Sequence, residues 1–140
     1  MERVNYSDVH CMNILKYDEH RDYQHIISSC IKEGWQSMYS TKKDEYRMSL
    51  LTSDTLVAYD EKNYCGYIRC ITDKAFTIFC CELIVVPEYR RHGIGTLLID
   101  SVINVYPSCR MDLISDNDDF YTSNHFNIVG NGMRRRSKIV

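Results

Sequence analysis

Proline and glycine are scarce in this chain, with two prolines and six glycines among 140 residues. This low content excludes collagen-like and low-complexity sequences. An excess of charge of one sign is also lacking, since seventeen Lys and Arg residues stand against nineteen Asp and Glu residues, for a formal net charge of -2. Proteins whose main ligand is DNA or RNA carry a basic excess, so we expect no nucleic-acid partner.

Long apolar runs are missing too. A typical one, residues 83–86, is far shorter than the roughly 20 residues of a membrane-spanning helix, so we expect no membrane partner. Residues 1–12 lack the apolar core of a secretory signal, which predicts a cytoplasmic protein. The seven cysteines are odd in number and contain no Cys-x-x-Cys pair. We interpret them as reduced, mostly buried thiols and expect no metal.

The first half of the chain contains two helical patterns. Apolar residues are 44% of the sequence and charged residues 26%, as in a globular domain with one core. In residues 18–32 the apolar side chains recur at steps of three and four, and Gly34 follows as a stop signal, which predicts an amphipathic helix. Residues 43–51 predict a second, shorter helix.

Three strands are predicted next. Residues 55–59 and 64–71 are rich in β-branched and aromatic side chains, and the four polar residues between them predict a hairpin. Residues 76–86 are almost wholly apolar and end at Pro87, so we expect a long central strand covered on both faces.

The second half predicts alternating elements. Residues 94–105 place their apolar side chains on one helical face, 111–115 predict a short strand, 120–123 a brief helix and 126–129 a last strand. The order of two helices, three strands, helix, strand, helix and strand indicates an α/β fold with a mixed, mostly antiparallel sheet flanked by helices.

The segment from Leu83 to Thr96 connects the long strand to the following helix. Its glycines, Gly93 and Gly95, leave the first N–H groups of that helix uncovered, and these groups form an anion site that suits phosphate. Basic side chains nearby would strengthen the attraction. Many strand-to-helix turns contain glycine for backbone reasons only, so this pattern alone leaves both interpretations open. Walker and dinucleotide-binding loops are excluded by the glycine spacing and the missing Lys-Ser/Thr pair.

Two motifs resemble the GCN5-related N-acetyltransferase (GNAT) superfamily. The run Leu83-x-Val85-x-Pro87-Glu88-Tyr89-Arg90-x-x-Gly93-Ile94-Gly95 resembles its motif A, and Phe120-Tyr121-x-x-x-x-Phe126 resembles its motif B. In motif B, His125 stands where glycine is usual, and His is a residue that tolerates a left-handed backbone.

This resemblance implies a single N-acetyltransferase domain over residues 1–140, with acceptor-side helices in 1–54 and a cofactor-binding core in 55–133. Acetyl-CoA is the implied co-substrate. The backbone of the strand would pair with its pantetheine arm, and a strand bulge would aim a backbone N–H, that of Val85, at the thioester carbonyl. Asn117 either caps the motif B helix or contacts the cofactor. The full set of implied cofactor-binding residues is Leu83, Ile84, Val85, Arg90, Arg91, His92, Gly93, Ile94, Gly95, Thr96 and Asn117.

The implied reaction is direct transfer of acetyl to a primary amine, which must first lose a proton. An ammonium of pKa about 10 is only about one part in a thousand free base at pH 7, so a base would help. Glu82, the one carboxylate in the long strand, is either that base or part of an ion pair in the sheet. Tyr121 matches the motif B tyrosine that protonates the CoA thiolate. A non-catalytic acyl-CoA-binding or sensor module is the alternative. The expected partners are a small-molecule or peptide amine and, as in many such proteins, a second copy in a homodimer.

Overall fold

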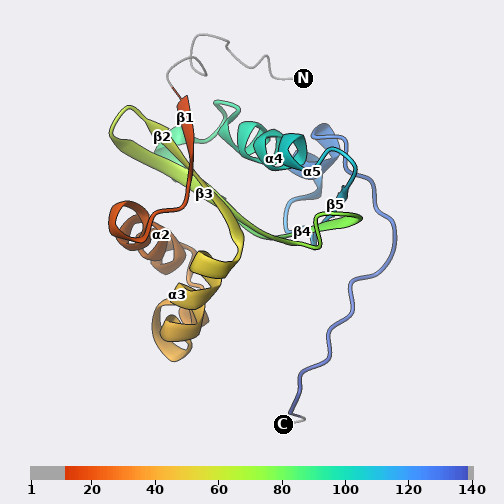
Figure 1. The fold of residues 1–140 in the computed structure, drawn as a ribbon, viewed down its shortest axis with the longest axis horizontal. Helices are drawn as coiled ribbons and strands as arrows, with labels where there is room; N and C mark the ends of the chain where they lie inside the picture. Colours follow the sequence, from red (N-terminus) through yellow and green to blue (C-terminus); the bar gives the residue numbers. More distant parts are fainter. Residues whose placement is uncertain (1–11, 139–140) are drawn as a thin grey trace.

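The structure is a computed structural model that describes residues 12–138 (Figure 1). Residues 1–11, which include most of the segment in which we predict no secretory signal, and residues 139–140 lie outside the described part. Within the described part, no helix has both the length and the apolar character needed to cross a membrane.

A mixed sheet forms the centre of the described chain. Its five strands lie in the order β1-β2-β3-β4-β5, with antiparallel pairing from β1 to β4 and parallel pairing between β4 and β5. The mostly antiparallel mixed sheet predicted from the sequence is therefore confirmed. The strands are β1 (Met12–Lys16), β2 (Asp54–Asp60), β3 (Asn63–Thr72), β4 (Thr77–Val85) and β5 (Arg110–Asp112).

Two helices cover one face of this sheet (Figure 1). Helix α2 (Glu19–Glu33) begins where the Asp18 side chain accepts the Arg21 N–H and ends at Gly34. A π-helical segment, η1 (Ser37–Thr41), leads to α3 (Lys43–Thr52). Both predicted N-terminal helices are confirmed. The core on this face consists of Ile26, Cys30, Tyr46, Leu50, Val57, Tyr59, Tyr67 and Ile84.

The opposite face carries α4 (Ile94–Val105) and, beside β5, the short helix α5 (Asp118–Ser123) (Figure 1). A 3-10 turn, η2 (Pro87–Tyr89), separates β4 from α4. Of the six described cysteines, four are buried and none is in a disulfide. The core on this face consists of Ala58, Cys65, Ile68, Cys70, Ile78, Cys80, Ile94, Leu98, Ile99 and Val102.

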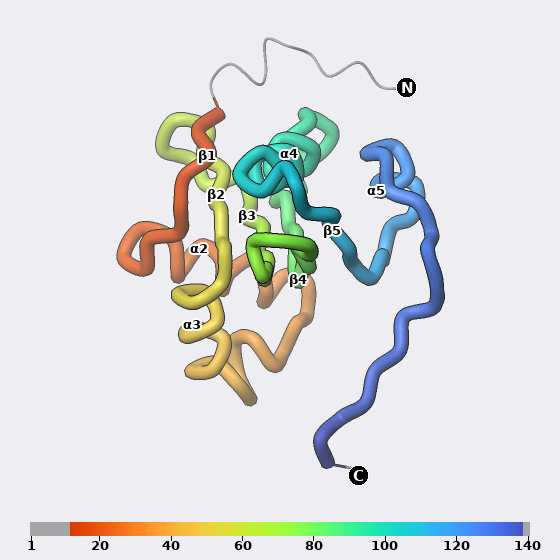
Figure 2. Tube along the Cα trace, turned by 45° about the vertical axis from the view of Figure 1, so that its right-hand side comes forward, coloured from red at the N-terminus to blue at the C-terminus, as the bar shows by residue number. Residues whose placement is uncertain are grey.

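The predicted order of elements is wrong at both ends. Strand β1 was not predicted, because five residues give too short a pattern to reveal pairing with β2. The strand predicted at residues 126–129 does not form: these residues are extended but have no strand partner in the described chain. Residues 126–138 instead run along and away from the body as a C-terminal arm (Figure 2). A β-rich pattern becomes a strand only when another strand supplies its hydrogen bonds.

Candidate functional site

A bulge in β4 determines which side chains face which layer. On β3, Arg69 pairs with Glu82 while the next residue, Cys70, pairs with Cys80, so Cys81 is the extra residue. Side chains alternate between faces along a strand, and a bulge reverses that alternation. Cys80 accordingly packs with α4, whereas Ile84 packs with α2 and α3. The bulge was expected, and it lies four residues before Val85.

Beyond the bulge, one edge of β4 lacks a strand partner. Within the described chain, β5 pairs with β4 only at residues 77–79. On the other edge, the Val86 N–H donates to the Cys65 carbonyl over 2.8 Å. Along an antiparallel strand, the backbone N–H and C=O groups of successive residues point to alternate edges. The backbone groups of Ile84, like those of Val86, therefore point to β3. Those of Leu83 and Val85 point to the opposite edge, beside β5. Leu83 and Val85 thus fit a surrogate strand, and Ile84, buried and paired with Tyr67, supports the strand instead.

The loop after β4 ends at an uncovered helix terminus. Gly93 precedes the first turn of α4 with φ 79°, and no described side chain caps the N–H groups of that turn. Arg91 also has positive φ, 65°. The uncapped N–H groups and the positive end of the helix dipole favour an anion there. Arg91 and His92 are exposed, Thr96 is half-buried, and Ile94 is buried in the core, so Ile94 offers only its backbone.

Gly95 has a packing role in α4. A Cβ on Gly95 would lie 2.9 Å from Cζ of Phe120, closer than real side-chain contacts allow. Its lack of a side chain lets α5 approach the first turn of α4. The two motifs recognised in the sequence are therefore in direct contact in the fold.

Arg90 anchors the loop to two neighbouring elements. Its Nε donates to the Val85 carbonyl over 2.8 Å, and its Nη2 lies 2.9 Å from Oε1 of Glu33 at the end of α2. These contacts hold the loop against β4 and α2. Contact of Arg90 with a phosphate stays a prediction.

Glu82 is buried and ion-paired. Its side chain is 4% exposed, and both carboxylate oxygens accept from Arg69, with Nε at 3.0 and 2.8 Å and Nη2 at 2.8 Å. Burial lowers the pKa of Arg69, but the carboxylate outweighs it and leaves that pKa raised. The ion pair, which was one of the two interpretations of Glu82, is present.

A polar network extends from this ion pair toward α3. Arg69 donates to the Ser53 hydroxyl over 3.1 Å and lies over the Tyr46 ring, 5.6 Å from its centroid. The Tyr46 and Tyr67 hydroxyls share a hydrogen bond of 2.7 Å. Arg69 was not predicted from the sequence. A usable signal was present, because Arg69 is the one charged residue in the predicted strand 64–71, and Glu82 is the one carboxylate in the next predicted strand.

Tyr121 lies on the other face of the sheet. Its ring makes edge contacts with Phe120 and Phe126, at centroid distances of 5.0 and 5.5 Å. Burial raises the pKa of Tyr121, and the nearby Cys80 and Asp116 raise it further. The phenol therefore keeps its proton at neutral pH and can act as a donor.

The turns around α5 agree with the motif B interpretation. Oδ1 of Asn117 accepts the Phe120 N–H over 3.2 Å, so the capping role of Asn117 is confirmed and a cofactor contact stays a prediction. His125 has φ 69°, the left-handed conformation that the motif position requires.

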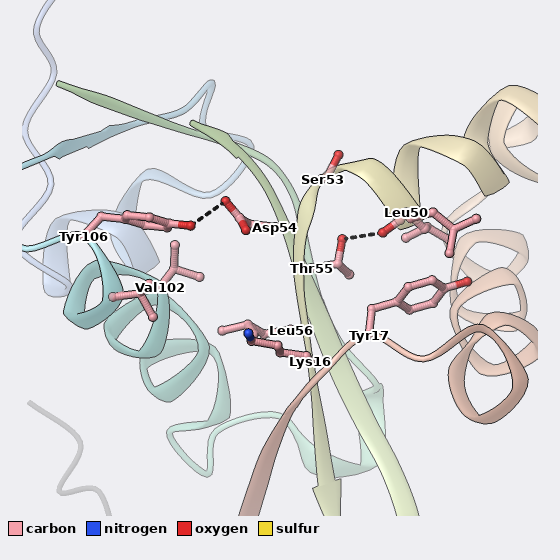
Figure 3. A pocket seen from close by; sticks show the side chains of 11 residues that line it. Lys16, Tyr17, Leu50, Ser53, Asp54, Thr55, Leu56, Val102 and Tyr106 are labelled. Atoms are coloured by element: carbon pink, nitrogen blue, oxygen red, sulfur yellow. Dashed lines mark hydrogen bonds between the residues drawn. The ribbon is translucent and has the colours of Figure 1, made fainter. Parts of the chain in front are cut away.

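Two hollows of the described chain lie outside the ion pair and the Tyr121 cluster, and the larger one is lined in part by Val86, Glu88 and Tyr89 of the loop after β4. One, of about 290 Å³, lies at the far end of α4, where Tyr106 donates to Asp54 over 3.0 Å (Figure 3). The other, of about 360 Å³, lies between α2 and the β2–β3 turn. Neither is lined by Glu82 or Tyr121.

The chain is similar to known acetyltransferases. Residues 52–128 match the family model described as acetyltransferase (GNAT) domain. The fold is similar to a GNAT family acetyltransferase from Streptococcus pneumoniae, with TM-score 0.75 and 23% identity over 91% of this chain and 99% of that chain. No curated protein sequence matches the chain.

Two further solved structures are similar. One is an aminoglycoside acetyltransferase from an uncultured soil metagenomic sample, with TM-score 0.73 and 15% identity over 94% of this chain and 98% of that chain. The other is AAC(6')-Iy in complex with a bisubstrate analogue, with TM-score 0.69 and 14% identity over 91% of this chain and 99% of that chain. At these identities the likeness shows the fold alone.

Proposed function

The chain belongs to the GNAT acetyltransferase family, and from this premise we propose that it transfers an acetyl group from acetyl-CoA to a primary amine by direct transfer. The observation that carries the proposal is the gap beside β4. There, the backbone groups of Leu83 and the N–H of Val85, which have no strand partner in the described chain, lie next to the uncapped N-terminus of α4, while the Val85 carbonyl accepts from Arg90. A ligand with an amide-containing arm and a pyrophosphate matches both features.

The residues of the loop fit this co-substrate. The N–H groups of residues 91–96 would hold the pyrophosphate, and Leu83 and Val85 would pair with the pantetheine arm. Gly93 adds no side chain at the helix terminus, so phosphate can approach its backbone closely. When bound, acetyl-CoA supplies an activated acetyl group, and the Val85 N–H would stabilise charge on the acetyl oxygen.

The acid and base would act from opposite faces of β4. The bulge puts Glu82 on the side of α2 and α3, and Tyr121 packs on the side of α4. The amine would approach from the α2 and α3 side, lose its proton toward Glu82 and attack the acetyl carbon. The C–S bond then breaks, Tyr121 would give its proton to the thiolate, and the second proton of the attacking nitrogen would leave to solvent, from which Tyr121 is reprotonated.

The acceptor class is a small-molecule or peptide amine. One similar structure is described as an aminoglycoside acetyltransferase, which makes aminoglycosides and polyamines the first compounds to screen. Peptides with a free N-terminus form the second group.

Isothermal titration with CoA and acetyl-CoA tests the binding step, and chromatographic detection of CoA release tests turnover with each amine. We expect micromolar binding and amine-dependent CoA release. A folded protein without measurable CoA affinity would overturn the proposal.

A non-catalytic acyl-CoA-binding module is the second candidate. The observation that favours it is the Arg69–Glu82 ion pair, because both oxygens of the carboxylate already accept hydrogen bonds from the guanidinium. Tight acetyl-CoA binding with no turnover of any amine would select this candidate.

A further inference from the structure

The hollow of about 290 Å³ at the far end of α4 lies beside the first residues of β2, which β1 does not reach (Figure 3). Lys16, the last residue of β1, is directly opposed to Leu56, but β2 begins two residues earlier, at Asp54. After Lys16 the chain makes one more hydrogen bond to β2, from the Tyr17 N–H to the Thr55 carbonyl, and continues into α2. The edge of β2 is therefore open at its first residues, with α4 on one side of it and α3 on the other.

Two opposite charges line this hollow without forming an ion pair. Lys16 and Asp54 are diagonal neighbours on the same face of the sheet, a placement that puts Cβ atoms about 7–8 Å apart. Figure 3 shows both side chains on the side of β2 that faces α4. Among the described residues Lys16 has no ion pair, and Asp54 accepts one side-chain hydrogen bond, from Tyr106 on Oδ2. The Lys16 ammonium and Oδ1 of Asp54 are thus available to a ligand.

The rest of the lining is largely apolar. Leu50 and Val102 are buried, whereas Leu51 and Val105 are 51% and 61% exposed. Apolar walls with a few convergent polar groups are typical of small-molecule sites. A cavity of about 150 Å³ holds benzene, so this hollow has room for a molecule of about ten non-hydrogen atoms.

We propose that this hollow binds an apolar α-amino acid of about the size of leucine, in its zwitterionic form. The carboxylate of the ligand would pair with Lys16, its ammonium with Asp54, and its side chain would cover the exposed leucine and valine. A ligand with both charges gives each of the two side chains a partner. A simple amine or a simple carboxylate satisfies only one of them and leaves the other charge without a partner.

This site is separate from the proposed acetyl transfer, because neither Glu82 nor Tyr121 lines the hollow. Ser53 lies between the two, since it lines the hollow and its hydroxyl accepts from Arg69 over 3.1 Å. Binding of the amino acid is tested in the absence of acetyl-CoA. Failure of this test would therefore leave the proposed reaction unaffected.

Isothermal titration of the full chain with L-leucine measures the affinity. We expect a dissociation constant below about 1 mM for leucine. Binding should be at least about tenfold weaker for 4-methylpentanoate, which lacks the ammonium, and for 3-methylbutylamine, which lacks the carboxylate. Glycine keeps both charges without the side chain and should also bind at least about tenfold more weakly. No measurable binding of leucine at about 10 mM, or equal affinities for leucine and the two analogues, would overturn the proposal.

Two variants assign the charges to their partners. Lys16→Gln should weaken leucine binding at least about tenfold and leave the affinity for 3-methylbutylamine unchanged. Asp54→Asn, which keeps an oxygen for Tyr106, should weaken leucine binding to a similar extent and leave the affinity for 4-methylpentanoate unchanged. Lys62→Gln is the matched control, because it removes another exposed lysine, just before β3, and should not alter leucine binding. Circular dichroism verifies the fold of each variant, and unchanged leucine affinity in folded Lys16→Gln and Asp54→Asn would contradict the proposal.

Amide chemical shifts in isotope-labelled protein locate the bound amino acid. Leucine should shift the resonances of residues 16–17, 53–56 and 102–106, which border the hollow. Shifts gathered at residues 82–85 and 121 instead would place leucine in the proposed acceptor site and overturn the assignment of this hollow.

Discussion

Arg69 on β3 and Glu82 on β4 are directly opposed cross-strand partners, and their side chains form an ion pair with 2.8 Å between Nη2 and Oε2. The carboxylate is almost fully buried, and the guanidinium is 15% exposed. An unpaired buried charge would be costly, so Arg69 is what allows a carboxylate at this point of an apolar strand.

The variant Glu82→Gln distinguishes two roles of Glu82, a catalytic base and a purely structural partner of Arg69. If Glu82 accepts the amine proton, kcat/KM at pH 7 should fall about tenfold to a hundredfold and recover in part as pH rises and free amine appears. The measurement is a pH profile of CoA release for wild type and Glu82→Gln.

Arg69→Met is the control for this experiment, because it breaks the same ion pair and keeps the carboxylate. Both variants should lose about 3–5 kcal/mol of unfolding free energy, because each removes one partner of a buried ion pair. Equal stability losses with parallel pH profiles for Glu82→Gln and wild type would assign Glu82 to structure alone.

Tyr121→Phe tests the proposed acid. The ring keeps its contacts with Phe120 and Phe126, so CoA affinity should change less than twofold, while kcat should fall about a hundredfold with the loss of the proton donor. Tyr106→Phe, a change of the same kind near the far end of α4, should leave kcat unaltered. Equal kcat for Tyr121→Phe and wild type would contradict the acid role.

Gly93→Asp tests the phosphate site. The substitution puts a carboxylate beside the N-terminus of α4, and CoA affinity should fall more than tenfold in calorimetry because two anions would compete for the same N–H groups. Gly34→Asp is a matched control, since Gly34 has φ 74° against 79° for Gly93 and lies at the end of α2. Both variants should lose about 1 kcal/mol of stability from the left-handed backbone. Unchanged CoA affinity in Gly93→Asp would contradict the proposal that this loop binds the pyrophosphate.

Asp73 should make stability depend on acid pH. Its Oδ1 accepts the N–H groups of Thr77, Phe76 and Ala75 in the β3–β4 turn, which lowers the pKa of Asp73 to about 2. The pKa of Asp in an unfolded chain is about 3.9. Because the pKa is lower in the folded state, the carboxylate stabilises the fold above about pH 4, and this contribution is lost as the pH falls through about 2. Urea unfolding at successive pH values should show the gap between wild type and Asp73→Asn shrinking over that window. A gap that stays constant down to pH 2 would contradict this account.

Local patterns of the sequence determined most helices and strands. The three- and four-residue spacing predicted α2 and α4, the polar residues between two β-rich runs predicted the β2–β3 hairpin, and the loop at residues 90–96 was identified with its uncovered helix terminus. Each of these signals lies within about twenty neighbouring residues, because helix periodicity, turns and helix ends depend on local geometry.

Only the tertiary structure decided features that depend on strand partners. One extra residue at Cys81 reverses the face of every side chain after it, so the sequence alone does not place Glu82 beside Arg69 and away from Tyr121. Strand β1 formed because β2 supplied hydrogen bonds, and residues 126–129, with an equally β-rich pattern, stayed unpaired within the described chain. Strand pairing is a contact between segments that are distant in the sequence. An alternation of apolar and polar residues with a period of two therefore predicts that a segment can form a strand, but it does not predict which strand pairs with it.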